Sequence, residues 1–137
     1  MDRTAGNEPT DAGERGTSFP RSARLLRKQE FDRVFAEGRS LHCRSFTAVV
    51  MRSTAARSRL GLVVGRKLDR RATGRNRIRR RIREVFRIHA SRLASAWDIV
   101  IIPRARALSC SHEALRRDMI EMLDKLSREG DKRDDRE

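Results

Sequence analysis

The segment from Arg75 to Arg83, with the sequence RNRIRRRIR, places six arginines in nine residues. A guanidinium group donates two parallel hydrogen bonds to phosphate oxygens, and its flat face stacks on nucleobases. Within the same segment, Ile78 and Ile82 lie four residues apart, which is the spacing of neighbours on one face of a helix. These residue types at this spacing predict a helix that packs on a core through one face and binds a polyanion through the other.

A helical wheel separates the two faces of this segment and its continuation. An arc of roughly 100° contains the apolar positions and one histidine: Ile78, Ile82, Val85, Phe86, His89 and Leu93. The opposite side carries Asn76, Arg79, Arg80, Arg83 and Arg87, with Arg77 and Arg81 on the other flank. Like charges at helical spacing repel each other by a few tenths of a kcal/mol per pair. The alternative is a solvated face that aids solubility, but this density of arginine favours a bound polyanion.

The positive charge is concentrated in one part of the chain. Residues 66–87 carry eleven basic and two acidic side chains, which is +9 of the total formal charge of +14. Residues 1–18 sum to −2 and residues 127–137 to −1, so residues 19–126 hold +17. We predict a disordered N-terminal tail over 1–18, a basic domain over 19–126 that binds nucleic acid, and a charged C-terminal tail over 127–137.

Other partners are less consistent with the sequence. A membrane surface would also attract this charge, but no apolar run approaches the ~18 residues that span a bilayer. The segment 1–18 has no apolar block of the kind found in a signal peptide, so we expect a cytoplasmic protein. Cys43 and Cys110 are then expected to be reduced thiols, because neither has the spacing of a zinc site.

The sequence predicts no catalytic residues and no metal site in the protein itself. Cleavage of a phosphodiester by protein groups normally requires clustered carboxylates that hold metal ions, or a pair of histidines. The acidic side chains of the basic domain are dispersed, and the His112-Glu113 pair lacks the second histidine of a zinc protease motif. No motif for a small-molecule substrate is present.

The remaining elements follow from periodicity and turn signals. Phe31, Val34 and Phe35 predict a short amphipathic helix over 29–37, and Gly38 supplies its stop. Strands are expected at 45–51 and 59–65, as an antiparallel pair, and at 98–102. The basic helix is expected from Thr73, as N-cap, to Leu93, and a last helix from Ser111, as N-cap, to Leu126. The order α-β-β-α-β-α predicts an α+β fold, a two-layer α/β sandwich.

Several segments together resemble one known family. They are the RNRIRRRIR segment, GLVVGRK at 61–67, Arg24-Leu-Leu, the FDRVF helix at 31–35 with Gly38, and DIVIIPR at 98–104. Over residues 19–126 the chain resembles the bacterial ribonuclease P protein component. The resemblance implies a fold related to a ribosomal protein domain, with a left-handed β-α-β crossover in place of the common right-handed form.

The resemblance also implies a function. A protein of this family assists a catalytic RNA subunit in the endonucleolytic removal of the 5′ leader from precursor tRNA. The hydrolysis, and the Mg²⁺ that it requires, belong mainly to the RNA. The implied partners are therefore the catalytic RNA subunit of ribonuclease P and the precursor tRNA leader. A ribosomal or assembly protein that binds RNA through the same basic face is the alternative.

Residue roles follow from the same resemblance. Binding to the RNA subunit is implied for Arg75, Asn76, Arg77, Arg79, Arg80, Arg83 and Arg87. A cleft for the single-stranded leader is implied for Phe31, Phe35, Arg66 and Lys67. The alternative for both phenylalanines is an ordinary place in the core. The chain departs from the family at Asp69, where a glycine is expected, and in the length of the loop at 68–74, so we expect the loop that carries Arg66 and Lys67 to have a geometry of its own.

Overall fold

A four-stranded sheet forms the centre of the protein. The structure is a computed structural model that describes residues 21–136, with side-chain surroundings for 22–129, so the predicted tail at 1–18 lies outside the described residues. The strands are β1 (Arg39–His42), β2 (Phe46–Arg52), β3 (Arg59–Leu62) and β4 (Trp97–Pro103). Their order across the sheet is β1-β2-β4-β3, and β3 with β4 is the parallel pair.

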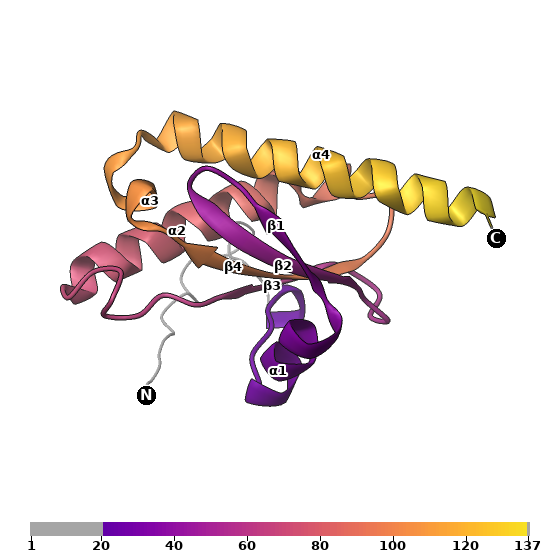
Figure 1. Cartoon of the computed structure of the whole chain (residues 1–137), viewed down its shortest axis with the longest axis horizontal. Coiled ribbons are helices and arrows are strands. Elements are labelled where there is room, and N and C mark those ends of the chain that lie inside the picture. The colour runs from indigo at the N-terminus through magenta and orange to yellow at the C-terminus, as the bar shows by residue number, and fades with distance from the viewer. Residues whose placement is uncertain (1–20, 137) are drawn as a thin grey trace.

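Helices cover the two faces of this sheet unequally. The helices are α1 (Lys28–Glu37), α2 (Ala72–His89), α3 (Ala105–Ser109) and α4 (His112–Arg136), with short 3-10 turns η2 (Arg21–Ala23) and η3 (Ala90–Arg92). Figure 1 shows the long helices α2 and α4 on one side of the sheet and α1 on the other. The predicted α+β sandwich is confirmed. The first predicted helix, α1, lies on the face of the sheet opposite α2 and α4.

The alternation of side chains along the strands builds a separate cluster on each face. The main core lies between the sheet and α2 and α4, and its largest fully buried members include Phe46, Phe86, Trp97, Ile99, Ile101, Leu115 and Leu123. The second cluster consists of Leu25, Val34, Val49 and Val100, with Phe31, Met51 and Ile102 partly buried against it. Helix α1 packs on the sheet through this smaller cluster.

The predicted antiparallel pairing of the strands at 45–51 and 59–65 is wrong. β4 lies between them, antiparallel to β2 and parallel to β3. The hairpin partner of β2 is β1, a short strand at the sheet edge that the periodicity did not reveal because Leu41 is its one buried side chain. The connection β3–α2–β4 is a parallel crossover, and its hand stays a prediction.

The helix ends also differ from the expectations. The N-cap of α2 is Arg71 rather than Thr73, and the α-helix ends at His89, where η3 continues the turn to Arg92. The cap predicted for the last helix is confirmed, because Ser111 Oγ accepts the Ala114 N–H at 3.1 Å. This helix does not end at Leu126, since α4 continues through Arg136. The short α3 was not predicted.

Candidate nucleic-acid interface

The packing of α2 determines which of its arginines face outward. Ile78, Ile82, Val85 and Phe86 are buried in the main core, as their spacing predicts. Burial of these four side chains stabilises the helix by several kcal/mol in total, at about 1.5–3 kcal/mol for each. That is enough to offset the repulsion among the arginines on the opposite side.

The predicted binding residues on α2 fall into groups of different exposure. Asn76, Arg77 and Arg80 are exposed, and we call these three residues the exposed basic face. Arg83 and Arg87 are half-buried, and Arg87 Nη2 donates to Glu84 Oε2 at 2.6 Å. Arg77 and Arg80 of this face therefore extend into solvent, while Asn76 Oδ1 accepts a hydrogen bond from Arg79 Nη1 at 2.9 Å.

Two arginines of the predicted set brace the loop before the helix. Arg75 Nη1 donates to the carbonyl oxygens of Asp69 and Arg70, each at 2.9 Å. Arg79 donates to the Val64 carbonyl at 3.2 Å. Burial lowers the pKa of Arg79, and the neighbouring charge of Arg75 lowers it further. Arg75 and Arg79 thus use some of their N–H donors for hydrogen bonds within the protein.

The carboxylate of Asp69 accepts hydrogen bonds that shape this loop. It accepts the Arg71 N–H at 2.9 Å and the Arg71 side chain at 3.4 Å. The backbone hydrogen bond from Arg71 is the main cause that lowers the pKa of Asp69. Its carboxylate also occupies the space beside Gly74, where an added β-carbon would overlap it. The acidic residue in place of the expected glycine therefore orders the start of α2.

Arg66 and Lys67 lie in the same loop and are exposed. They line a shallow hollow together with Leu68, Asp69, Arg70 and Arg71. The hollow is adjacent to the N-terminal end of α2, where the helix dipole and the unpaired backbone N–H groups favour an anion. The placement suits contact with phosphates.

On the other face of the sheet, α1 begins and ends at defined contacts. Glu30 Oε1 accepts the backbone N–H groups of Leu26 at 2.8 Å and Arg27 at 3.0 Å, which satisfies two donors at the helix start. At the other end, the Gly38 N–H donates to the Val34 carbonyl at 2.7 Å. Val34 is fully buried against the sheet and anchors the middle of the helix.

The two phenylalanines of α1 differ in their surroundings. Phe31 is partly buried, and its ring lies against Gly61 of β3, where an added β-carbon would be 2.7 Å from Cε1. Phe35 is 46% exposed. Phe31 thus contributes to packing while part of it faces outward, and Phe35 presents an aromatic ring to solvent from the same flank of the helix.

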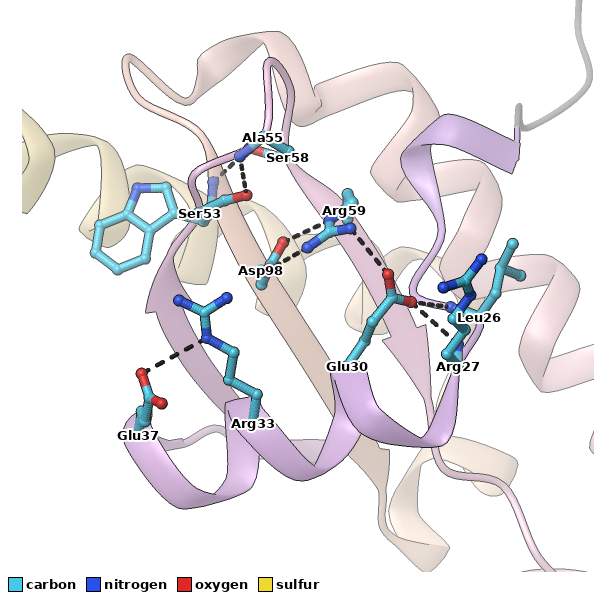
Figure 2. A network of polar contacts seen from close by, with 11 residues as sticks. Leu26, Arg27, Glu30, Arg33, Glu37, Ser53, Ala55, Ser58, Arg59 and Asp98 are labelled. Carbon is cyan, nitrogen blue, oxygen red and sulfur yellow. Dashed lines mark hydrogen bonds and ion pairs between the residues drawn. The ribbon is translucent and has the colours of Figure 1, made fainter.

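Sequence reasoning missed a network that joins α1 to the sheet (Figure 2). Arg59 donates to both carboxylate oxygens of Asp98, each at 2.9 Å, and to Glu30 Oε2 at 3.1 Å. Asp98 is 5% exposed, and its hydrogen bonds with Arg59 raise the pKa of that guanidinium. The one signal in the sequence that could have indicated it is an acidic residue, Asp98, at the start of an aliphatic strand, because a buried carboxylate requires a charged or hydrogen-bonding partner.

A second unpredicted cluster holds the end of β4 to the β1–β2 turn. Arg104 donates to the Cys43 carbonyl and to Thr47 Oγ1, the latter at 2.9 Å. Buried Ser45 donates to Asp118 of α4 at 2.5 Å. These contacts fix the turn that leads into β2.

Residues 21–136 contain neither a metal-binding cluster nor a helix that could span a membrane. Among these residues, no three His, Cys, Asp or Glu side chains are grouped so that they could hold a metal ion. In the same part of the chain, every helix is too short or too polar to cross a bilayer.

Comparisons with known proteins agree on one family. The family model for ribonuclease P matches residues 19–127. The ribonuclease P protein component of Desulfosudis oleivorans is 38% identical over 112 residues, which cover 82% of this chain and 92% of that protein. The corresponding protein of Thermotoga maritima is 39% identical over 89 residues, covering 65% of this chain and 75% of that protein.

Solved structures give the same result for the fold. The RNase P protein from Thermotoga maritima superposes with a TM-score of 0.68 at 32% identity, and covers 74% of this chain and 96% of that one. The Staphylococcus aureus RNase P protein superposes with a TM-score of 0.67 at 30% identity, and covers 77% of this chain and 94% of that one. The chain therefore belongs to the family of bacterial ribonuclease P protein components.

Proposed function

We propose that this chain is the protein subunit that assists the catalytic RNA of ribonuclease P in removing the 5′ leader from precursor tRNA. It binds the RNA subunit through α2, and it binds the single-stranded leader where α1 meets the sheet. The chemistry takes place in the RNA subunit, and the protein supplies binding, orientation and positive charge.

The arrangement of arginines on α2 is the observation that carries this proposal. A helix whose core face is filled and whose outer face is basic gains stability when phosphates neutralise that face. Arg77 and Arg80 are exposed, and Arg75 and Arg79 brace the preceding loop. The bracing holds Arg66 and Lys67 beside the helix start, so that loop and helix present one continuous basic surface to an RNA backbone.

The leader site rests on a different set of residues. Unpaired bases stack on aromatic side chains without a requirement for a particular sequence, at about 1–3 kcal/mol per base. Phe35 is exposed and Phe31 is partly exposed on the flank of α1. Such rings accept leaders of varied sequence, as a processing enzyme with many tRNA substrates requires.

We place the Mg²⁺ of this reaction in the RNA subunit. The candidate interface consists of guanidinium and ammonium groups, which repel a divalent cation. The same groups neutralise phosphates and thereby reduce the repulsion within the folded RNA, so that a lower concentration of Mg²⁺ suffices. We assign the protein to the cytoplasm, where precursor tRNA is made in bacteria.

The proposal is tested by binding to a bacterial ribonuclease P RNA at a fixed salt concentration, followed by titration of the assembled complex with tRNA. We expect tight assembly and a higher affinity for precursor tRNA that carries a leader than for mature tRNA. Assembly without this preference would favour a ribosomal type of RNA-binding protein. Failure to assemble would contradict the proposal.

A further inference from the structure

One guanidinium group joins three segments of the chain. Arg59 on β3 faces Asp98 on β4, since these two residues are partners in the register of the parallel strands. Arg59 Nε and Nη2 donate to the two oxygens of Asp98, and Nη1 donates to Glu30 Oε2 on α1. A planar guanidinium bound to a carboxylate at two points has little freedom to rotate. Arg59 is therefore a rigid connection between the sheet and α1 (Figure 2).

The two oxygens of Glu30 have separate tasks. Oε1 accepts the N–H groups of Leu26 and Arg27 and so begins the helix. Oε2 accepts the hydrogen bond from Arg59 and so docks the helix on the sheet. The capping contact and the docking contact can therefore be separated by a substitution that keeps one acceptor oxygen.

The docking contact lies next to the aromatic residues. Phe31 follows Glu30 on α1, and its ring lies against Gly61, two residues beyond Arg59 on β3. Residues two apart on a strand share one face of the sheet. Consecutive residues of α1 thus contact alternate residues of β3, and a displacement of Glu30 also displaces Phe31.

We propose that Arg59 and Glu30 are positioning residues for the leader, which hold α1 at the place on the sheet where Phe31 and Phe35 can receive unpaired bases. This inference rests on the proposed leader binding at α1. Asp98 keeps Arg59 in place from within the core, because its carboxylate is buried and both of its oxygens are bound. Neither Arg59 nor Glu30 needs to touch the leader.

Glu30→Gln tests the docking contact. The amide oxygen of the glutamine can still accept the capping hydrogen bonds, while its NH₂ group replaces the acceptor opposite Arg59. Glu37→Gln is the matched control, because it removes the same charge from an exposed position at the other end of α1. Both variants are assembled with a bacterial ribonuclease P RNA, and KM and kcat are measured for precursor tRNA together with the affinity for mature tRNA.

For Glu30→Gln we expect KM for leader-bearing precursor to rise about fivefold, the ratio that a contact of ~1 kcal/mol supports. We expect kcat at saturation and the affinity for mature tRNA to stay at the wild-type values, and Glu37→Gln to match the wild type throughout. Arg59→Lys should give the same pattern, because an ammonium can stay near Asp98 but lacks the fork that joins both carboxylates.

Three results would overturn the inference. If Glu30→Gln and Glu37→Gln behave alike while the wild type prefers leader-bearing precursor, the docking contact has no role and the proposed function stands. If Glu30→Gln and Arg59→Lys weaken binding of precursor and mature tRNA equally, the network is a general stabilising element. If the wild-type complex has no preference for the leader, both the inference and the leader role are wrong.

Discussion

The ring of Phe31 occupies the space that a side chain at position 61 would need. A β-carbon built on Gly61 would lie 2.7 Å from Phe31 Cε1 and 2.8 Å from Cζ. Real β-carbons do not approach a ring this closely, so the absence of a side chain at position 61 allows α1 to sit close to β3. Gly61, which has no side chain, therefore determines how closely Phe31 and α1 pack against β3.

Gly61→Ala should therefore displace Phe31 and destabilise the protein. We expect the free energy of unfolding to fall by about 1–3 kcal/mol, the usual cost of overpacking, and the affinity for leader-bearing precursor to fall with it. Gly65→Ala is the control, because a β-carbon at Gly65 would have no neighbour within 4 Å. Urea denaturation of both variants measures the difference. Equal losses in the two variants would contradict the packing account.

Phe35→Ala separates leader binding from stability. Because Phe35 is 46% exposed, its truncation should change the free energy of unfolding by no more than about 0.5 kcal/mol. The affinity of the assembled complex for leader-bearing precursor should fall by about 1 kcal/mol or more if one base stacks on the ring. Ile88→Ala removes a similarly exposed apolar side chain from α2 and serves as the control. Unchanged precursor affinity in Phe35→Ala would remove Phe35 from the leader site.

Arg77→Ala and Arg80→Ala should weaken binding to the RNA subunit through the loss of phosphate contacts. In a plot of log K against log salt concentration, each lost contact makes the slope shallower by about 0.7–0.9. Arg33→Ala removes an equal charge from α1, on the opposite side of the sheet, and should leave the slope unchanged. Slopes that match the wild type in Arg77→Ala and Arg80→Ala would exclude the exposed basic face from the interface.

Glu30 predicts an acid-sensitive contribution to stability. The backbone N–H groups of Arg27 and Leu26 hold the pKa of Glu30 below its ordinary value. A group whose pKa is lowered by folding stabilises the protein above its unfolded pKa, and this contribution is lost as the pH falls through the folded value. The stability difference between wild type and Glu30→Gln should thus be constant near neutral pH and shrink below about pH 4. Chemical denaturation over a pH series measures it, and a difference independent of pH would contradict this role.

The helices were predictable because their information is local. The spacing of Ile78, Ile82, Val85 and Phe86 predicted the buried face of α2, and burial of all four confirms it. Phe31, Val34 and Phe35 likewise predicted α1, although Phe35 is exposed. The arginines of α2 were predicted to bind RNA as one set, whereas Arg75 and Arg79 also donate to loop carbonyls. These carbonyls belong to a loop whose path depends on Asp69, which periodicity does not describe.

Strand pairing was less predictable because it depends on distant segments. The polar loop between β2 and β3 favoured a hairpin, but β4, more than thirty residues later, pairs with both strands. β1 has one buried side chain and therefore no apolar pattern. The Glu30–Arg59–Asp98 network joins three elements, and no local spacing in the sequence brings these residues together.

Cleavage of a 5′-extended precursor tRNA by a bacterial ribonuclease P RNA at low Mg²⁺, with and without this protein, tests the central claim most directly. The proposed function predicts cleavage at the mature 5′ end when RNA and protein are both present, and none with the protein alone. Cleavage by the protein alone would reveal an active site in the protein. If the protein has no effect on an RNA that is competent at high Mg²⁺, the role as its assisting subunit is contradicted.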